Sequence, residues 1–133
     1  MLHLDLIILH LKQKEFWLLH VIYLQIVYVV DADGKIRHWH YTSGKLLSTI
    51  DEPDNAINGL HYRNDGLKFV TVGSDIKVRI YDSLLMKNTI TMDQGTENET
   101  SGHSNRIFCA KFHPLQPDVL ISGGWDDTIQ VKF

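Results

Sequence analysis

The sequence has little cysteine and no excess of positive charge. Cys109 is the only cysteine among 133 residues, which excludes an intrachain disulfide and a cysteine-based zinc site and fits a reducing compartment. The 13 basic and 16 acidic residues give a formal net charge of −3, so no overall positive field is available to hold a phosphate backbone. We therefore expect no nucleic-acid partner, and a cytoplasmic or nuclear protein.

A long apolar run is also missing. Residues 16–30 carry no formal charge, but these 15 positions are fewer than the about 20 that a spanning helix needs. The start of the chain lacks the basic first residues and the small-residue cleavage site of a signal peptide. We therefore favour a buried strand for residues 16–30, and keep a membrane anchor at these residues as an alternative.

Three segments of the sequence follow one pattern. They start at Asp33, Asp75 and Asp126, and in each an acidic turn leads into a short strand with alternating apolar residues. The first interval is 42 positions, which matches a four-stranded blade of roughly 40 to 45 residues, and the second is 51 because residues 93–101 form a polar insertion. No segment of 31–133 has a helical period, so the pattern predicts an all-β fold.

The strands around these turns align in the same frame, and each apolar strand is followed by turn residues. This alignment predicts the last half of one blade, one complete blade and three strands of another. We expect residues 24–133 to form this repeat region, and residues 1–23 to be an apolar N-terminal segment outside it. The further strands expected are residues 57–62 and 107–112, 68–73 and 119–124, and 45–50 and 87–92.

These features resemble WD repeats. The resemblance is carried by the Asp-bearing turns, by strands that end in Trp39 or Tyr81, and by the pairs Gly102-His103 and Trp125-Asp126. It implies an incomplete WD-repeat β-propeller of four-stranded antiparallel blades, a fold that serves as a rigid platform for other proteins. About two and a half blades are present, whereas a closed ring has about four to eight.

Each blade buries its faces only against its neighbours, so a partial ring exposes apolar surface and unpaired strand edges. We therefore expect further blades to come from a longer chain or from another subunit. A truncated product without independent function is the alternative.

The family's network of hydrogen-bonded His, Ser/Thr and Asp residues carries over unevenly. His103, Ser122 and Asp126 hold these positions in the last copy, but Lys132 stands where the terminal Trp is expected. In the middle copy Glu52-Pro53 replaces the Gly-His pair. The remaining positions that match are Thr71, Asp75 and Tyr81 in the middle copy and Asp33 and Trp39 in the first.

His103, Ser122 and Asp126 also have the composition of a hydrolase triad. A catalytic Ser needs a strained elbow beside an oxyanion hole, whereas Ser122 follows Leu120-Ile121 inside a strand. His38 and His40 face one side of a strand, but no third metal ligand has suitable spacing. We therefore predict no catalysis, no metal and no cofactor.

The connections between blades and the Asp-bearing turns lie on one rim of a propeller. Asn55, Asn105, Arg106 and Trp125 fall in these places, and Trp and Arg often anchor protein interfaces. The sequence therefore predicts a non-catalytic protein-interaction scaffold that presents rim loops to protein or peptide partners.

Overall fold

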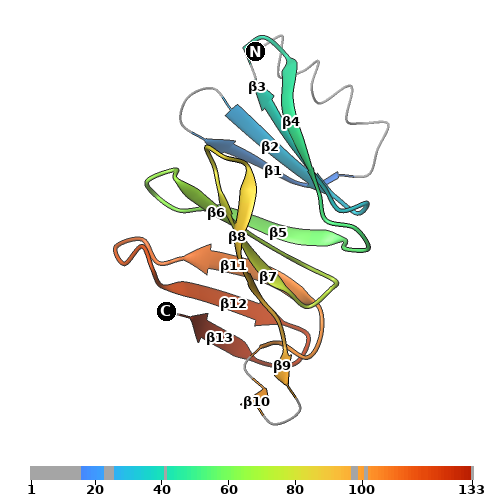
Figure 1. Cartoon of the computed structure of the whole chain (residues 1–133), viewed down its shortest axis with the longest axis vertical. Coiled ribbons are helices and arrows are strands. Elements are labelled where there is room, and N and C mark those ends of the chain that lie inside the picture. The colour runs from blue at the N-terminus through green and yellow to red at the C-terminus, as the bar shows by residue number, and fades with distance from the viewer. Residues whose placement is uncertain (1–15, 23–25, 41, 97–98, 101, 133) are drawn as a thin grey trace. The chain divides into compact units, whose positions relative to one another are not determined.

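The computed structural model describes residues 16–22, 26–40, 42–96, 99–100 and 102–132. The chain divides into two compact units, Met1–Ile57 and Asn58–Phe133, which are described separately. In the described parts all regular structure is β, and the sheets are antiparallel (Figure 1). The predicted all-β fold is confirmed.

The first unit holds one four-stranded sheet with its strands in sequence order. A β-bulge between His38 and Trp39 shifts the register of the two last strands. Lys45, at the start of the last strand, pairs with His40. The strands are β1 (Phe16–Ile22), β2 (Ile26–Asp31), β3 (Lys35–His40) and β4 (Lys45–Asp51).

Strand β1 lies in the segment that we expected outside the repeat, residues 1–23. It pairs along its length with β2, so the first sheet starts at Phe16 and has four strands in place of half a blade. Residues 16–22 are apolar except for His20 and lack the period-2 alternation of a half-buried strand, so the buried strand expected here was not assigned to the repeat. The rest of the expected N-terminal segment lies outside the described residues.

The second unit contains a four-stranded and a three-stranded sheet, plus a two-stranded ribbon in the polar insertion. Within the described residues the three larger sheets are fewer than the about four to eight blades of a closed propeller, as predicted. The strands are β5 (Ile57–Tyr62), β6 (Lys68–Gly73), β7 (Val78–Asp82) and β8 (Lys87–Met92); β11 (Ile107–Phe112), β12 (Leu120–Gly124) and β13 (Ile129–Lys132); and β9 (Gly95–Thr96) and β10 (Glu99–Thr100).

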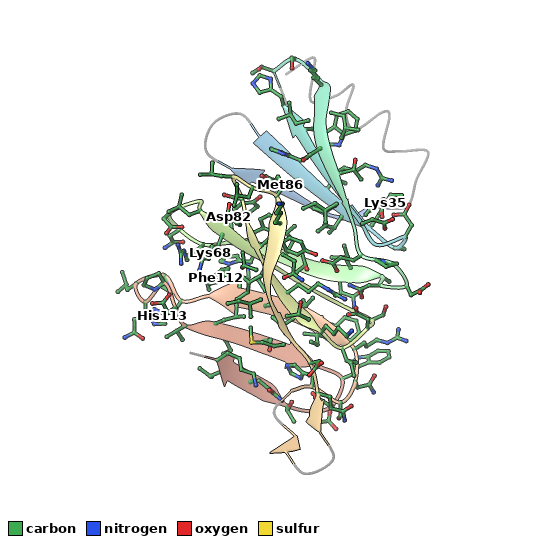
Figure 2. The ribbon with its side chains drawn as sticks, viewed as in Figure 1. Lys35, Lys68, Asp82, Met86, Phe112 and His113 are labelled. Carbon is green, nitrogen blue, oxygen red and sulfur yellow. The ribbon has the colours of Figure 1, made fainter. Side chains whose placement is uncertain are left out.

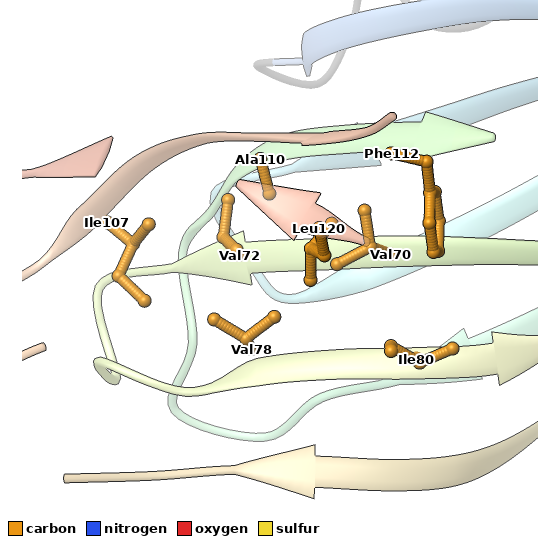
Figure 3. Packing of buried hydrophobic residues seen from close by; sticks show 8 residues of the cluster. All are labelled: Val70, Val72, Val78, Ile80, Ile107, Ala110, Phe112 and Leu120. Atoms are coloured by element: carbon orange, nitrogen blue, oxygen red, sulfur yellow. The ribbon is translucent and has the colours of Figure 1, made fainter. Parts of the chain in front are cut away.

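The core of the second unit lies between its two larger sheets (Figure 3). Because side chains alternate along a strand, β6 and β7 present one apolar face, which packs on residues from β11 and β12. Burying each of the larger side chains contributes roughly 1.5–3 kcal/mol. The cluster consists of Val70, Val72, Val78 and Ile80 on the first sheet and Ile107, Ala110, Phe112 and Leu120 on the second.

Two details fix how closely these sheets approach. A Cβ atom on Gly59 would lie 3.2 Å from the carbonyl oxygen of Phe108, so the strands β5 and β11 pass each other with little room for a side chain. The amide Nδ2 of Asn58 donates to the carbonyl oxygen of Ile107 at 3.0 Å.

In the described part of the chain, no helix is long and apolar enough to cross a membrane. Residues 16–22 and 26–31, which include most of the alternative anchor segment, are strands.

Candidate functional site

His103 is the centre of a buried polar network in the third sheet. Its Nε2 lies 2.8 Å from Oγ of Ser122, and its Nδ1 lies 2.9 Å from Oδ2 of Asp126. Since a carboxylate only accepts, Nδ1 carries a proton, and in the neutral imidazole Nε2 then accepts a hydrogen bond from the Ser122 hydroxyl. The structure thus brings together the three residues that the sequence pattern selected.

Asp126 accepts several hydrogen bonds besides that of His103. The backbone amide of Ser104 donates to Oδ2 at 2.9 Å, and the hydroxyl of Thr128 donates to Oδ1 at 2.8 Å. Burial alone would raise the pKa of the Asp126 carboxyl, but these donors together hold that pKa well below its ordinary value. The charged carboxylate thereby joins β13 to the segment before β11.

Gly102 is required by the local backbone. A Cβ atom at this position would lie 2.0 Å from the carbonyl oxygen of Asp93, and backbone atoms cannot move aside as the end of a side chain can. The Gly-His pair therefore has a steric reason: only glycine lets the chain pass Asp93 and bring His103 inward.

The network does not have the form of a hydrolase site. Ser122 lies within strand β12 and is 2% exposed, so its hydroxyl has no open approach for a substrate. The hydroxyl bonds to the imidazole, and Asp126 accepts hydrogen bonds from the Ser104 amide and the Thr128 hydroxyl. Among the described residues no three His, Cys, Asp or Glu side chains are grouped as a metal site. His38 and His40 instead contact hydroxyls, those of Ser48 and Ser43.

Beside the network lies an exposed aromatic and cationic cluster, which consists of Arg106, Phe108 and Trp125. Trp125 is 63% exposed, and its ring centroid lies 5.0 Å from that of Phe108. The guanidinium carbon of Arg106 lies 5.2 Å from the Trp125 ring, within the range of a cation–π interaction. The backbone amide of Trp125 also donates to the carbonyl of Arg106 at 3.0 Å, so the backbone fixes the pair.

The other two predicted rim residues differ in their surroundings. Asn105 is exposed, and its side-chain oxygen accepts the backbone amide of Arg106 at 2.8 Å. Asn55 is 1% exposed and donates Nδ2 to Oε2 of Glu52 at 2.6 Å, so it supports its own loop and is not presented to a partner. Phe108 was not predicted as a partner-binding residue because it lies within an expected strand. Its alternation with the buried Ile107 puts it on the outer face of that strand.

Comparison with known proteins agrees with this geometry. Residues 95–131, which include the His103 network and the exposed cluster, match the family "WD domain, G-beta repeat". This chain therefore carries a WD40 repeat.

Curated relatives support the assignment over more of the chain. A guanine nucleotide-binding protein subunit beta-like protein of Encephalitozoon cuniculi (strain GB-M1) is 26% identical over 80% of this chain and 45% of its own length. Human WD repeat-containing protein 3 is 29% identical over 67% of this chain and 10% of its own length. Eukaryotic translation initiation factor 3 subunit I of Dictyostelium discoideum is 25% identical over 69% and 25%. The chain thus spans less than half the length of these relatives.

The other two repeats use arginine at the turn. Arg79 pairs with Asp75, and Arg37 pairs with Asp31 and with Asp33, whose Oδ2 lies 3.5 Å from Nη2. In both repeats the arginine follows the turn Asp by four positions. Sequence reasoning found the acidic residue in each repeat but missed this partner.

The remaining network positions lie inside their WD40 sheets. Thr71 is fully buried on β6, Tyr81 is buried on β7, and Trp39 is buried on β3. Tyr81 stacks on Phe69, with ring centroids 4.9 Å apart. These side chains are placed for packing and internal bonding, and the exposed cluster around Trp125 is the part of the site that a partner can reach.

Proposed function

We propose that this WD40-repeat protein is a non-catalytic interaction scaffold that binds protein or peptide partners through Asn105, Arg106, Phe108 and Trp125. The observation that supports this is the exposure of Trp125 in a fixed arrangement with Arg106 and Phe108. Trp and Arg are the residue types that most often dominate binding energy. Because the rings and backbone already hold one another, little conformational entropy is lost when a partner docks.

The mechanism is presentation without a reaction of its own. The His103–Asp126 bonds fix the chain before β11 against the turn before β13, and this turn carries Trp125. A buried network of this kind keeps the surface residues in position without taking part in the contact. With a single cysteine, Cys109, the chain suits a reducing compartment, and the proposal places it in the cytoplasm or the nucleus.

The partners include further blades, from a longer chain or another subunit. Sheet β11–β13 has three strands, whereas the other two larger sheets have four. Its outer residues Ile129 and Val131 are 74% and 50% exposed, while their counterparts Val78 and Ile80 on the preceding sheet are 4% and 8% exposed. An apolar face of this kind needs a neighbour.

The scaffold role is tested by crosslinking. A photo-reactive amino acid is placed at Ser104 in three chains: the otherwise unchanged chain, Trp125→Ala and Leu115→Ala. The crosslinked proteins are then compared. Leu115→Ala is the control, because it removes an exposed side chain from a distant turn. We expect a defined set of proteins crosslinked by the unchanged chain and by Leu115→Ala, and lost with Trp125→Ala. The same set in all three samples would contradict the proposal. A thermal melt checks that Trp125→Ala stays folded.

A further inference from the structure

Three polar side chains join sheet β5–β8 to sheet β11–β13, beside the apolar core between them. Nδ2 of Asn58, on β5, donates to the first carbonyl oxygen of β11 at 3.0 Å. At the other end of β11, the backbone amide of Phe112 donates to Nδ1 of His61 at 3.1 Å. Nδ2 of Asn64, in the turn after β5, donates to the carbonyl oxygen of Pro114 at 2.8 Å. These three hydrogen bonds, here called the joint, hold β11 and its turn against β5.

A change of pH affects the three bonds of the joint differently. The side-chain amides of Asn58 and Asn64 do not titrate, so they donate in acid as they do at neutral pH. The bond of His61 is different: a backbone amide only donates, so Nδ1 must hold a lone pair to accept it. A charged imidazole carries protons on both ring nitrogens and accepts nothing. Protonation of His61 therefore ends its bond to β11.

Other histidines have partners that tolerate either charge state, or partners in the same turn. Nδ1 of His38 and Nδ1 of His40 lie beside hydroxyl groups, which turn to donate or to accept. His103 contacts a hydroxyl and a carboxylate. His113 does accept backbone amides, but within its own turn. His61 thus combines an acceptor that must stay unprotonated with a position between two sheets.

The charged groups around the joint do not favour a positive imidazole. The rings of His61 and Phe112 are tilted by 33° with centroids 6.3 Å apart. Lys111, next to Phe112, lies on the opposite face of β11 because side chains alternate. The ionisable groups that line the space beside Phe112 are Arg63, Lys68, Asp118 and Lys132. Even with Asp65, which pairs with Arg63, the cations of this region outnumber its carboxylates.

We propose that the joint is a pH-sensitive device, in which protonation of His61 releases the end of β11 from β5. The contribution of this bond is present at neutral pH and is lost as the pH falls from about 7 to 5, where an imidazole in water gains its proton. Ala110 and Phe112 belong to the apolar core (Figure 3), so we expect a local opening and not unfolding of the unit. Figure 2 shows Phe112 and His113 at the end of β11 that opens. The device involves no partner and does not depend on the scaffold role.

Hydrogen exchange of the full 15N-labelled chain, followed by NMR at pH 7 and at pH 5, tests the proposal at the Phe112 amide. Protection factors are compared, because they correct for the pH dependence of exchange in an unfolded chain. We expect the protection of this amide to fall about tenfold or more at the lower pH, since the amide loses its acceptor. The 15N shifts of the His61 imidazole are a second measurement, and they should show Nδ1 without a proton at pH 7.

Two matched variants assign the effect to His61. His61→Asn places a carbonyl oxygen close to the position of Nδ1 and does not titrate, so Phe112 should have equal protection at both pH values. His40→Asn makes the same change at a histidine that contacts the Ser43 hydroxyl, and it should keep the fall of the unchanged chain. Equal protection at both pH values in the unchanged chain would overturn the proposal, as would the same fall in His61→Asn or a proton on Nδ1 at pH 7. If circular dichroism shows that His61→Asn does not fold, the exchange of the unchanged chain and the imidazole shifts still decide.

Discussion

The imidazole Nε2 of His103 lies 2.8 Å from the hydroxyl oxygen of Ser122, and both side chains are 2% exposed. The two residues come from different elements, the segment before β11 and strand β12. Their contact therefore joins the entry of the third sheet to its middle strand. Because neither group can reach water, each depends on the other for its hydrogen bond.

Ser122→Ala is expected to destabilise the chain by about 1–3 kcal/mol, because the change leaves Nε2 of His103 buried without its donor. Urea unfolding followed by fluorescence measures the loss. Ser122→Thr keeps the hydroxyl and has the residue type of the equivalent Thr71, so it should retain more of the stability. Ser104→Ala, at an exposed side chain, should be close to neutral; an equal loss in Ser104→Ala and Ser122→Ala would refute the assigned role of the buried hydroxyl.

The sequence predicts the repeat because backbone turns need particular residues. Asp33, Asp75 and Asp126 each begin a turn before a short strand, and the alternation after them identifies the strands that the structure contains. These signals are local. Strand β1 lies in the segment for which a buried strand was expected, but its place in the first sheet was missed because that place depends on pairing with β2, and an apolar run does not reveal a partner.

The site was predictable in part, for a similar reason. The spacing of His103, Ser122 and Asp126 follows from one repeat, whereas the burial of Asn55 depends on Glu52 and the exposure of Phe108 depends on which face of β11 meets β6. Contacts between sheets are set by packing, and one sequence without its relatives contains no direct record of them.

The carboxyl group of Asp126 should make stability depend on acid pH. Its pKa in the folded chain is lowered, and the unfolded value is about 3.9, so the unfolded state binds more protons between the two values. The stabilisation is fully present above about pH 4 and is lost as the pH falls toward the folded pKa. Urea unfolding between pH 2.5 and pH 6 should show this fall.

Asp126→Asn should flatten that acid dependence, because the titrating group is gone. Asp127→Asn is the control: its backbone φ is 57°, a conformation that Asn adopts readily, and the neighbouring carboxyl is left in place. The control should keep the dependence of the unchanged chain. Identical pH profiles for both variants would show that Asp126 is not the source of the effect.

Gly102→Ala should be more damaging than the same change at another glycine of the second unit. Its Cβ would meet the Asp93 carbonyl oxygen at 2.0 Å, so the backbone before His103 must shift. Gly66→Ala meets nothing within 4 Å, and its φ of +71° makes it cost about 1 kcal/mol. We expect Gly102→Ala to cost at least about twice as much in chemical unfolding. A smaller loss at Gly102 than at Gly66 would contradict the steric explanation of the Gly-His pair.

The outer face of β13 should control self-association of the chain. Ile129 and Val131 alternate on this strand. They correspond in the repeat to Val78 and Ile80 of sheet β5–β8, which are covered by sheet β11–β13. Without a further sheet, this apolar face is exposed to water. Strand β13 pairs only with β12 among the described strands, so another chain can cover both the face and the strand edge. The double variant Ile129→Thr, Val131→Thr keeps β-branched residues and removes apolar surface, so it should lower the average mass in light scattering after size exclusion.

Leu84→Thr with Leu115→Thr is the matched control for that measurement, because these leucines are 81% and 86% exposed in isolated turns. If exposed apolar area alone drove association, the control would reduce the mass at least as much as the β13 variant. We expect the opposite order because Ile129 and Val131, unlike the two leucines, belong to a face whose counterpart on sheet β5–β8 packs against the next sheet. An unchanged mass in the β13 variant, beside a lowered mass in the control, would remove the reason to expect a further sheet on this face.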